Sequence, residues 1–315
     1  MMIDVKRAAQ LLREQDDILI LTHMNPDGDT LGCGFGLCRA LLKFGKRARV
    51  INSDEIQKKY EYLFANLEMP DFEEKYIVSV DIATQSLFGE KLACYSDKVD
   101  LSIDHHPTNS FFAKETLLDD TAGATCEIIY EIIEELAIPF DKDMANCIYT
   151  GLSTDTGCFK YDNATSRTYI CAAKMIDCGA DNGKINQVMF DTKTRTFAKL
   201  ERLSIDTLRL YFDERCAVME VTQKMYRKSG SDETEVEGLV DLPRRIEGVL
   251  VGVTIKEKPD GTCKASVRSR AGFSASELCQ RMGGGGHPQA AACSFDVGVA
   301  EAKQRILDEI EKMLK

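Results

Sequence analysis

The sequence lacks the features that would place it in a membrane or outside the cell. Nowhere in its 315 residues does an apolar run approach the ~20 residues that a membrane-spanning helix needs. The first 17 residues are rich in charge and have no apolar stretch of the signal-peptide kind. None of the 12 cysteines forms a Cys-x-x-Cys pair, so a zinc ribbon or a thioredoxin-like site is not supported. We therefore expect a cytoplasmic protein with reduced thiols.

Basic residues are too few for a protein that grips long duplex nucleic acid. The chain has 40 Lys and Arg against 51 Asp and Glu, which gives a net charge of -11. Long nucleic acids are normally held by a basic surface, because the release of counterions supplies much of the affinity. The acidic excess lies in the first two thirds of the chain, whereas basic residues predominate between residues 243 and 281. A long duplex is therefore not expected as a partner, but a small phosphorylated ligand is compatible with this charge.

The first 190 residues alternate short apolar runs with amphipathic segments. Strands are predicted at residues 18–22, 47–52, 76–82 and 99–103. Helices are predicted at 31–44, within 119–136, and near 166–178 and 185–190. This alternation favours an α/β fold, with an open and mainly parallel sheet covered by helices.

The pattern changes near residues 190–212. A connecting helix is predicted at 194–210, and it is followed by strand-like segments at 216–221, 249–256 and 263–268 and a closing helix at 300–314. The polar run 227–237 is expected to be a solvated loop. We therefore expect a catalytic domain at 1–190, a linker helix within 191–212 and a smaller α+β domain at 213–315.

The sequence has only four histidines, and each lies near Asp or Gly residues that follow an apolar run. The first three of them and the neighbouring carboxylates are His23, Asp27, Asp29, Asp81, Asp104, His105, His106 and Asp155. Carboxyl ends of parallel strands share one edge of a sheet, so we expect these residues to meet in one crevice. Clustered carboxylates repel one another unless cations lie between them. Imidazole and carboxylate ligands without thiolate suit manganese, iron or cobalt, with magnesium and zinc as alternatives.

A single aspartate in this set has a simpler explanation. Asp29, for example, lies where it would cap the helix that begins near Leu31. Helix capping does not readily account for the whole set, so a metal site is favoured. Two ions about 3.5–4 Å apart can activate water and hold a phosphoryl group.

Glycine is concentrated in two places. The segment 32–36 does not match a dinucleotide-binding fingerprint, and close helix packing explains it better. The second run, Gly283, Gly284, Gly285 and Gly286, precedes His287 and lacks the Lys-Ser/Thr of a Walker A loop. Such a run can expose backbone N–H groups to an anion, with a flexible turn as the alternative. Because the surrounding segment is basic, we expect Arg268, Ser269 and Arg270 to face an anionic ligand near His287.

Other nucleophile chemistries receive no support. The segment Gly-Leu-Ser-Thr-Asp at 151–155 is not the Gly-x-Ser-x-Gly elbow of a serine hydrolase. No cysteine is distinguished as the nucleophile of a Cys–His enzyme.

Taken in order, these motifs resemble those of the DHH phosphoesterase superfamily. The segments 23–29, Asp81, 104–106 and 154–156 look like its four motifs, and 266–270 with the glycine run resemble its associated substrate-binding domain. Cys33 and Cys293 stand where the family often has Ser and Gly. The resemblance spans nearly the whole chain and points to the nanoRNase branch, oligoribonucleases that also dephosphorylate 3'-phosphoadenosine 5'-phosphate (pAp). The fold it implies is a mainly parallel sheet with helices on both faces, joined by a linker helix to a smaller α+β domain.

The resemblance also implies roles for individual residues. One ion of a two-manganese site is held by His23, Asp27 and Asp81, and the other by Asp29, Asp81, His105 and Asp155. Asp81 bridges the two ions, Asp104 supports them, and His106 orients the scissile phosphate or protonates the leaving oxygen. Arg268 and His287, with the glycine run, hold the terminal phosphate or nucleotide. Mg²⁺, Fe²⁺ and Co²⁺ are alternatives to Mn²⁺.

The function implied is hydrolysis of very short RNA to 5'-mononucleotides, with pAp as a further substrate. A phosphodiesterase for pApA or cyclic dinucleotides is the enzymatic alternative. An alternative of another class is a non-catalytic nucleotide-binding sensor, in which the loss of a metal ligand is expected. Short RNA, pAp or dinucleotides are the expected partners, a membrane is not, and a homodimer is left open.

Overall fold

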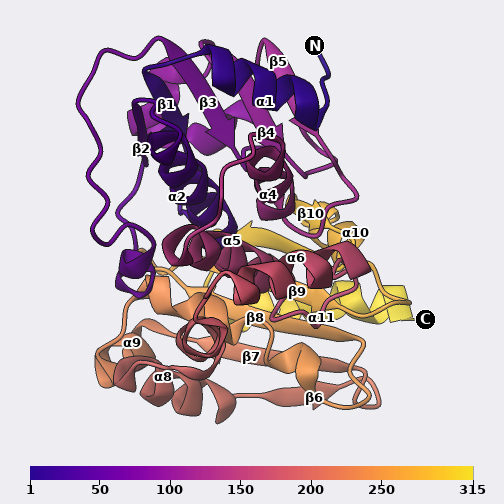
Figure 1. The fold of residues 1–315 in the computed structure, drawn as a ribbon. Helices are drawn as coiled ribbons and strands as arrows, with labels where there is room; N and C mark the ends of the chain where they lie inside the picture. Colours follow the sequence, from indigo (N-terminus) through magenta and orange to yellow (C-terminus); the bar gives the residue numbers. More distant parts are fainter. Residues whose placement is uncertain (315) are drawn as a thin grey trace. The chain divides into compact units, whose positions relative to one another are not determined.

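The computed structural model describes residues 1–314, apart from the side chains of residues 233, 234 and 237. The chain divides into two compact units, Met1–Thr192 and Lys193–Lys315 (Figure 1). Among the described residues, no helix is both long and apolar enough to cross a bilayer.

A five-stranded parallel sheet forms the centre of the first unit. Its strands are β1 (Ile18–Leu21), β2 (Ala48–Ile51), β3 (Tyr76–Val80), β4 (Leu101–Asp104) and β5 (Glu115–Leu118), in the order β2-β1-β3-β4-β5. Every neighbouring pair is parallel. The central strands β1, β3 and β4 are buried along their whole length, as expected of apolar strands covered on both faces. The predicted α/β class is confirmed.

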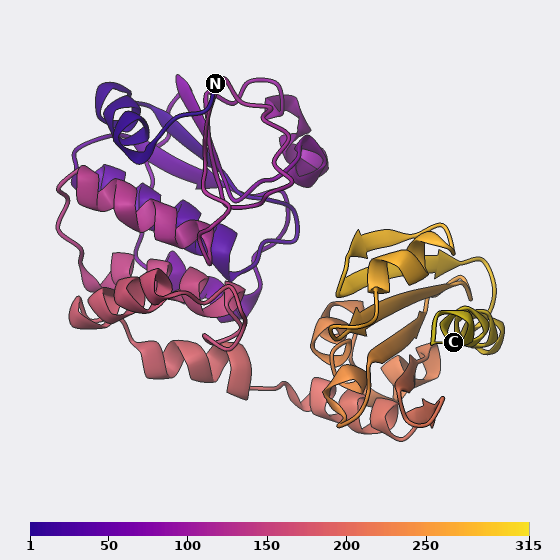
Figure 2. The ribbon, with the colours of Figure 1, turned by 90° about the vertical axis from the view of Figure 1, so that its right-hand side faces the viewer.

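Helices cover both faces of this sheet, but unequally. On one face α1 (Val5–Glu14), α2 (Gly28–Lys43) and α4 (Thr125–Glu135) enclose the main core. The other face is covered by a smaller cluster around Phe88, from the short helical turns between residues 85 and 95 that include α3 (Gly89–Leu92). The ribbon of Figure 2 shows the layers of this unit.

Three more helices, α5 (Lys142–Asp155), α6 (Ser166–Asp177) and α7 (Asn182–Asn186), complete the first unit. The α2 and α5 helices approach so closely that a Cβ at Gly32 would lie 2.5 Å from the carbonyl oxygen of Cys147. Gly32 and Gly36 therefore serve close helix packing, as predicted, whereas Gly34 faces Thr22 and Val50 on the sheet side.

The second unit contains a mixed six-stranded sheet in the order β10-β11-β9-β8-β7-β6. Its strands are β6 (Arg209–Tyr211), β7 (Cys216–Val221), β8 (Val251–Glu257), β9 (Cys263–Ser269), β10 (Gly285–His287) and β11 (Ala290–Phe295). Its helices are α8 (Arg195–Ile205), α9 (Gln223–Ser229), α10 (Ala275–Gln280) and α11 (Val299–Leu314). Residues 191–212, expected to form a linker helix, contain α8 and β6, which belong to this unit.

The prediction of a solvated loop at 227–237 is wrong. Helix α9 extends to Ser229, and a 3-10 helix spans Glu233–Leu239. Val236 and Leu239 are fully buried and pack with Leu200 of α8. Because these apolar residues lie among polar and charged ones, the sequence alone does not show that they are buried.

Candidate metal centre

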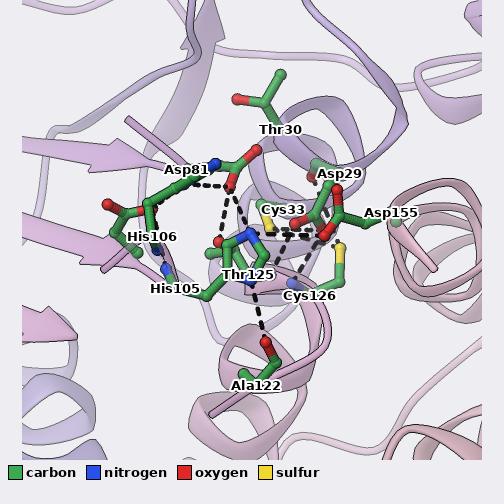
Figure 3. Close-up of polar contacts among 12 residues, drawn as sticks. Asp29, Thr30, Cys33, Asp81, His105, His106, Ala122, Thr125, Cys126 and Asp155 are labelled. Atoms are coloured by element: carbon green, nitrogen blue, oxygen red, sulfur yellow. Dashed lines mark hydrogen bonds and ion pairs between the residues drawn. The ribbon is translucent and has the colours of Figure 1, made fainter. Parts of the chain in front are cut away.

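Strand ends and helix ends bring the candidate ligands of the first unit together. His23 follows β1, Asp81 follows β3, and Asp104 ends β4 just before the two other histidines. Asp27 and Asp29 lie at the start of α2, and Asp155 is the last residue of α5. Figure 3 shows Asp29, Asp81, His105 and Asp155 turned toward a common centre.

The first group of possible ligands contains His23, Asp27 and Asp81. The Nε2 atom of His23 lies 3.6 Å from a carboxylate oxygen of each aspartate. The Nδ1 atom of the same ring contacts the carbonyl oxygen of Met24 at 2.8 Å, which fixes its orientation. Burial opposes protonation of His23, but its bonds to the two carboxylates prevail and raise its pKa to about 11.

Asp27, and not Asp29, caps the helix that follows. Its Oδ1 accepts the backbone N–H groups of Asp29 and Thr30 at 3.0 and 3.1 Å. The carboxylate of Asp29 instead accepts the N–H groups of Thr125 and Cys126 at 2.7 and 3.0 Å. Both groups lie at the start of α4, whose own N-cap residue, Ala124, has no side chain that can cap it. Asp29 therefore caps a helix almost a hundred residues away.

The environment of Asp29 is unfavourable for a negative charge. The residue is 1% exposed. Burial and the neighbouring carboxylates of Asp81 and Asp155 raise its pKa well above the ordinary value. Such a group needs a nearby cation if it is to stay ionised.

Asp81 lies between the two groups of possible ligands. Besides its contact with His23, its Oδ1 lies 3.8 Å from Nε2 of His105 and 3.6 Å from Nδ1 of His106. The hydroxyl of Thr125 donates to the same oxygen at 2.8 Å. The backbone of Asp81 is left-handed, with φ of 60°, a conformation that Asp tolerates better than most residues.

The second group contains Asp29, His105 and Asp155, whose ligand atoms all lie within 4.8 Å of one another. The Nε2 atom of His105 is 3.5 Å from Asp155, while Nδ1 contacts the carbonyl oxygen of Ala122 at 3.1 Å. Burial raises the pKa of Asp155 to about 7, although His105 opposes this shift.

Asp104 and His106 form a pair beside these ligands. Asp104 is fully buried and accepts His106 Nδ1 at 2.7 Å, Asn109 Nδ2 at 2.7 Å and two backbone N–H groups. These bonds occupy its oxygens, so it orients His106 and is poorly placed to bind an ion. The His106 side chain is 39% exposed. Burial opposes protonation of His106, but the bond to Asp104 outweighs it and raises the pKa to about 9.

These residues fit divalent metal ions. Each group combines imidazole nitrogen with carboxylate oxygen, the donor set that suits first-row divalent ions. The structure also reveals partners that the sequence did not suggest. Thr125 bonds Asp81, Asn109 bonds Asp104, and the thiols of Cys33 and Cys126 lie within 4.8 Å of a ligand atom of Asp29. No spacing pattern marks these residues, because each meets its partner only through the fold.

The structure accounts for part of the glycine run without a ligand. The N–H groups of Gly283 and Gly284 donate to the carbonyl oxygens of Gln280 and Cys279 at 3.1 and 2.8 Å. Gly285, Gly286 and His287 form β10 and pair with β11. A Cβ at Gly286 would lie 2.6 Å from atoms of β11, so close strand packing explains this glycine. The run therefore builds an edge strand that presents His287, which is exposed.

Arg268 and His287 lie on the same face of the second sheet. In the register, His287 is opposite Ala290 of β11, and Ala290 is opposite Arg268 of β9. Directly paired residues project to the same face, so the two side chains are two strands apart, about 10 Å. The Nε atom of Arg268 also lies 3.3 Å from Asp241.

Ser269 does not face a ligand as expected. Its side chain is fully buried, and its hydroxyl donates to the carbonyl oxygen of Phe273 at 2.8 Å and contacts that of Pro288 at 3.3 Å. It thereby holds the backbone that follows His287. Arg270 donates to the carbonyl oxygen of Arg244 at 3.2 Å.

Comparison with known proteins identifies the family. The model of the DHH family N-terminal domain matches residues 17–152, and the model of the DHHA1 domain matches residues 213–315. The chain therefore contains a DHH domain followed by a DHHA1 domain. A crystal structure of an exopolyphosphatase-related protein from Bacteroides fragilis shares the fold of this DHH protein, with a TM-score of 0.88, 23% identity and coverage of 98% of this chain and 95% of the other.

Curated relatives of this DHH protein include two described as bifunctional oligoribonuclease and PAP phosphatase NrnA. The protein from Thermus thermophilus is 28% identical over 98% of this chain and 94% of its own length. The one from Bacillus subtilis is 25% identical over 95% of both chains. The cyclic-di-AMP phosphodiesterase GdpP of Geobacillus thermodenitrificans is 26% identical over 96% of this chain but only 48% of its own length.

Proposed function

We propose that this protein is a metal-dependent phosphodiesterase that degrades very short RNA to 5'-mononucleotides and also dephosphorylates pAp. The observation that carries the proposal is the meeting of both ligand groups at Asp81, with His106 beside them. Similarity to the NrnA proteins over nearly the full length of both chains supports the choice of substrate.

Two Mn²⁺ ions are the proposed cofactors. The ligands assigned to one ion are His23, Asp27 and Asp81, and those assigned to the other are Asp29, Asp81, His105 and Asp155. When bound, two such ions activate water and neutralise charge on the phosphoryl group. Mg²⁺, Fe²⁺ and Co²⁺ suit several of the same ligands and are arms of the test below.

His106 is the residue proposed to handle the leaving group. As water attacks phosphorus and releases a proton to the solvent, a new P–O bond forms and the bond from phosphorus to the 3'-oxygen breaks. His106 donates its proton to that oxygen, which leaves the phosphate on the 5' side of the released nucleotide. Asp104 raises the pKa of His106, which favours the protonated ring, and holds the ring in place.

The second unit is proposed to capture the substrate. Arg268 and His287 are on one face, spaced so that two polar side chains can bind one nucleotide or its terminal phosphate. All 12 cysteines are free, which agrees with a reducing compartment such as the cytoplasm, where we propose that the protein acts.

Hydrolysis of cyclic or linear dinucleotides is the second candidate. The match of 96% of this chain to part of a cyclic-di-AMP phosphodiesterase favours it. A non-catalytic sensor is disfavoured, because the motifs that the chain resembles keep a His or Asp at every expected ligand position.

A substrate panel tests the proposal. The protein is stripped of metal and then assayed with each of the four ions on pAp, pApA, cyclic di-AMP, pyrophosphate and RNA of two to twenty nucleotides. The expected result is Mn²⁺-dependent turnover of two- to five-nucleotide RNA and of pAp. Asp81→Asn serves as the inactive control. Faster turnover of cyclic di-AMP than of any RNA supports the second candidate, and no turnover with any ion contradicts both.

A further inference from the structure

The backbone just after Asp155 has an unusual conformation. Gly157, Cys158 and Phe159 have φ of 58°, 60° and 61°, so three consecutive residues are left-handed. Two of them carry side chains, which disfavour this region. Strain of this kind clusters at functional sites, where the surrounding structure holds it in place.

Several aromatic residues pack around this strained turn. Phe159 lies between Tyr149 and Tyr169, with ring centroids 5.7 and 5.5 Å away. The hydroxyl of Tyr169 donates to the Phe159 carbonyl oxygen at 2.9 Å, which fixes that ring as part of the support. Tyr161 and Tyr169 are equally exposed, each at 52%, so what distinguishes Tyr161 is its position over Gly157.

One face of the Tyr161 ring covers Gly157. A Cβ built on Gly157 would lie 2.3–2.6 Å from the ring carbons Cζ, Cε1 and Cε2, so only glycine fits beneath the ring. Among the described residues, the Tyr161 hydroxyl has no hydrogen-bond partner, so packing against the turn sets the position of the ring. The ring is thus held from one side and exposed to solvent elsewhere.

The same turn carries a metal-ligand candidate. The N–H groups of Lys160 and Tyr161 donate to the carbonyl oxygen of Thr156, the residue after Asp155, at 2.9 and 3.1 Å. Asn163 donates to the carbonyl oxygens of Asp155 and Gly123 at 3.2 and 2.9 Å, which ties the turn to the loop before α4. Tyr161 and the reacting centre are therefore fixed to one piece of backbone.

We propose that Tyr161 is a stacking platform for the nucleobase next to the scissile phosphate. Aromatic rings recognise single-stranded RNA by stacking on its bases, whatever the sequence. This inference rests on the proposed function and adds a positioning residue to it. If the inference holds, the ring on this turn makes the protein prefer phosphodiesters that carry a base.

The test compares Tyr161→Ala and Tyr161→Phe with the unaltered protein. Substrates are pApA and the same dinucleotide with either base removed. Removal of the stacking ring is expected to lower kcat/KM on pApA by about five- to 150-fold. Tyr161→Phe is expected to restore activity, because the ring and not the hydroxyl does the stacking. On the dinucleotide lacking the stacked base, Tyr161→Ala and the unaltered protein are expected to be equal.

Two controls separate stacking from damage to the site. Manganese content must be unchanged in Tyr161→Ala. Phe44→Ala removes another exposed ring, 38% exposed, from the far end of α2 and is expected to have no effect. A dinucleotide containing 2-aminopurine adds a readout without turnover, because stacking on Tyr161 quenches its fluorescence in EDTA and Tyr161→Ala is expected to abolish the quenching.

The outcomes distinguish this inference from the proposed function. If the unaltered protein cleaves pApA and Tyr161→Ala cleaves it equally well, the platform is refuted and the proposed function stands. If Tyr161→Ala loses the same factor on substrates with and without bases, the ring only supports Asp155, and the platform is again refuted. If the unaltered protein neither cleaves nor binds dinucleotides, the proposed function fails and the platform fails with it.

Discussion

Replacing Asp81 by Asn is the sharpest test of the metal centre. Asp81 contacts His23 of one ligand group and His105 of the other, at 3.6 and 3.8 Å. Asn tolerates the left-handed backbone, with φ of 60°, and retains an oxygen for the Thr125 hydroxyl. The substitution therefore removes one charge while the metal-free fold is preserved, and both ions are expected to bind more weakly.

The size of the effect follows from binding linkage. An ion at 100 times its Kd stabilises the native state by about 2.7 kcal/mol, so two ions contribute about 5 kcal/mol. Each kcal/mol raises the Tm of a unit of this size by about 2–4 °C. Saturating Mn²⁺ is thus expected to raise the Tm of the first unit by about 10–20 °C, and Asp81→Asn to lose more than half of this increase.

Asp104→Asn is the matched control, because Asp104 is equally buried but bonds His106 and Asn109. It is expected to keep most of the Mn²⁺-dependent rise in Tm and to lose about 10–100-fold in activity, as supporting residues do. Thermal unfolding with and without Mn²⁺ is measured together with metal content. If Asp81→Asn still binds two Mn²⁺ ions tightly and keeps the full rise, Asp81 does not bridge them.

Three further predictions follow from the charges of the molecule. Turnover is expected to fall steeply as RNA lengthens from two to about twenty nucleotides, because the chain is acidic overall; equal rates at moderate salt contradict this. Arg268→Ala and His287→Ala are expected to keep full metal content and to lose kcat/KM on oligonucleotides far more than on bis-p-nitrophenyl phosphate; equal losses on both substrates would show that the second unit takes part in the chemistry. A metal-free His23 with a pKa of about 11 is protonated at pH 7.5 and binds metal only as neutral imidazole, so Mn²⁺ must release protons and its affinity must rise with pH. If adding Mn²⁺ to the protein in weak buffer does not acidify the solution, this prediction is contradicted.

The parallel sheet and its ligand-bearing edge could be predicted from sequence because the signals are local. Strands such as Ile18–Leu21 and Tyr76–Val80 are continuous apolar runs, and each is followed within two residues by a candidate ligand. Once the strands are taken as parallel, their carboxyl ends must meet, and no distance is needed to place His23 and Asp81 together.

Other elements left no such signal. The edge strand β5, Glu115–Leu118, is four residues long and half-buried at both ends, so it has too little apolar periodicity to be recognised. The strand β10 contains Gly285, Gly286 and His287, and glycine is depleted in strands. Only its pairing with β11 makes this segment a strand. Because that pairing cannot be read from the sequence, an exposed loop is expected there instead.

Individual contacts within the site were also beyond the sequence. The alternative explanation of Asp29, as the cap of its own helix, follows from its position, yet Asp27 caps that helix, and Asp29 caps α4. The hydroxyl of Ser269 was expected at a ligand and is instead buried against the carbonyl oxygen of Phe273. In both cases the side chain forms hydrogen bonds with backbone groups that become its neighbours only when the chain folds.

The charges of the metal centre show that its carboxylates are not equivalent. Desolvation by neighbouring atoms raises the pKa of Asp27, whose side chain is 55% exposed, but its contact with His23 more than offsets this and leaves the pKa lowered, so this carboxylate is stable when ionised without metal. Asp29 and Asp155 have raised pKa values, since burial and the repulsion of neighbouring carboxylates, Asp81 among them, outweigh the attraction of His105. A divalent ion is therefore expected to relieve more electrostatic repulsion in the group of Asp29, His105 and Asp155 than in the group that contains Asp27. The N–H groups of α4 hold Asp29 in that group, so the fold itself keeps this carboxylate in a place where its own charge is unfavourable.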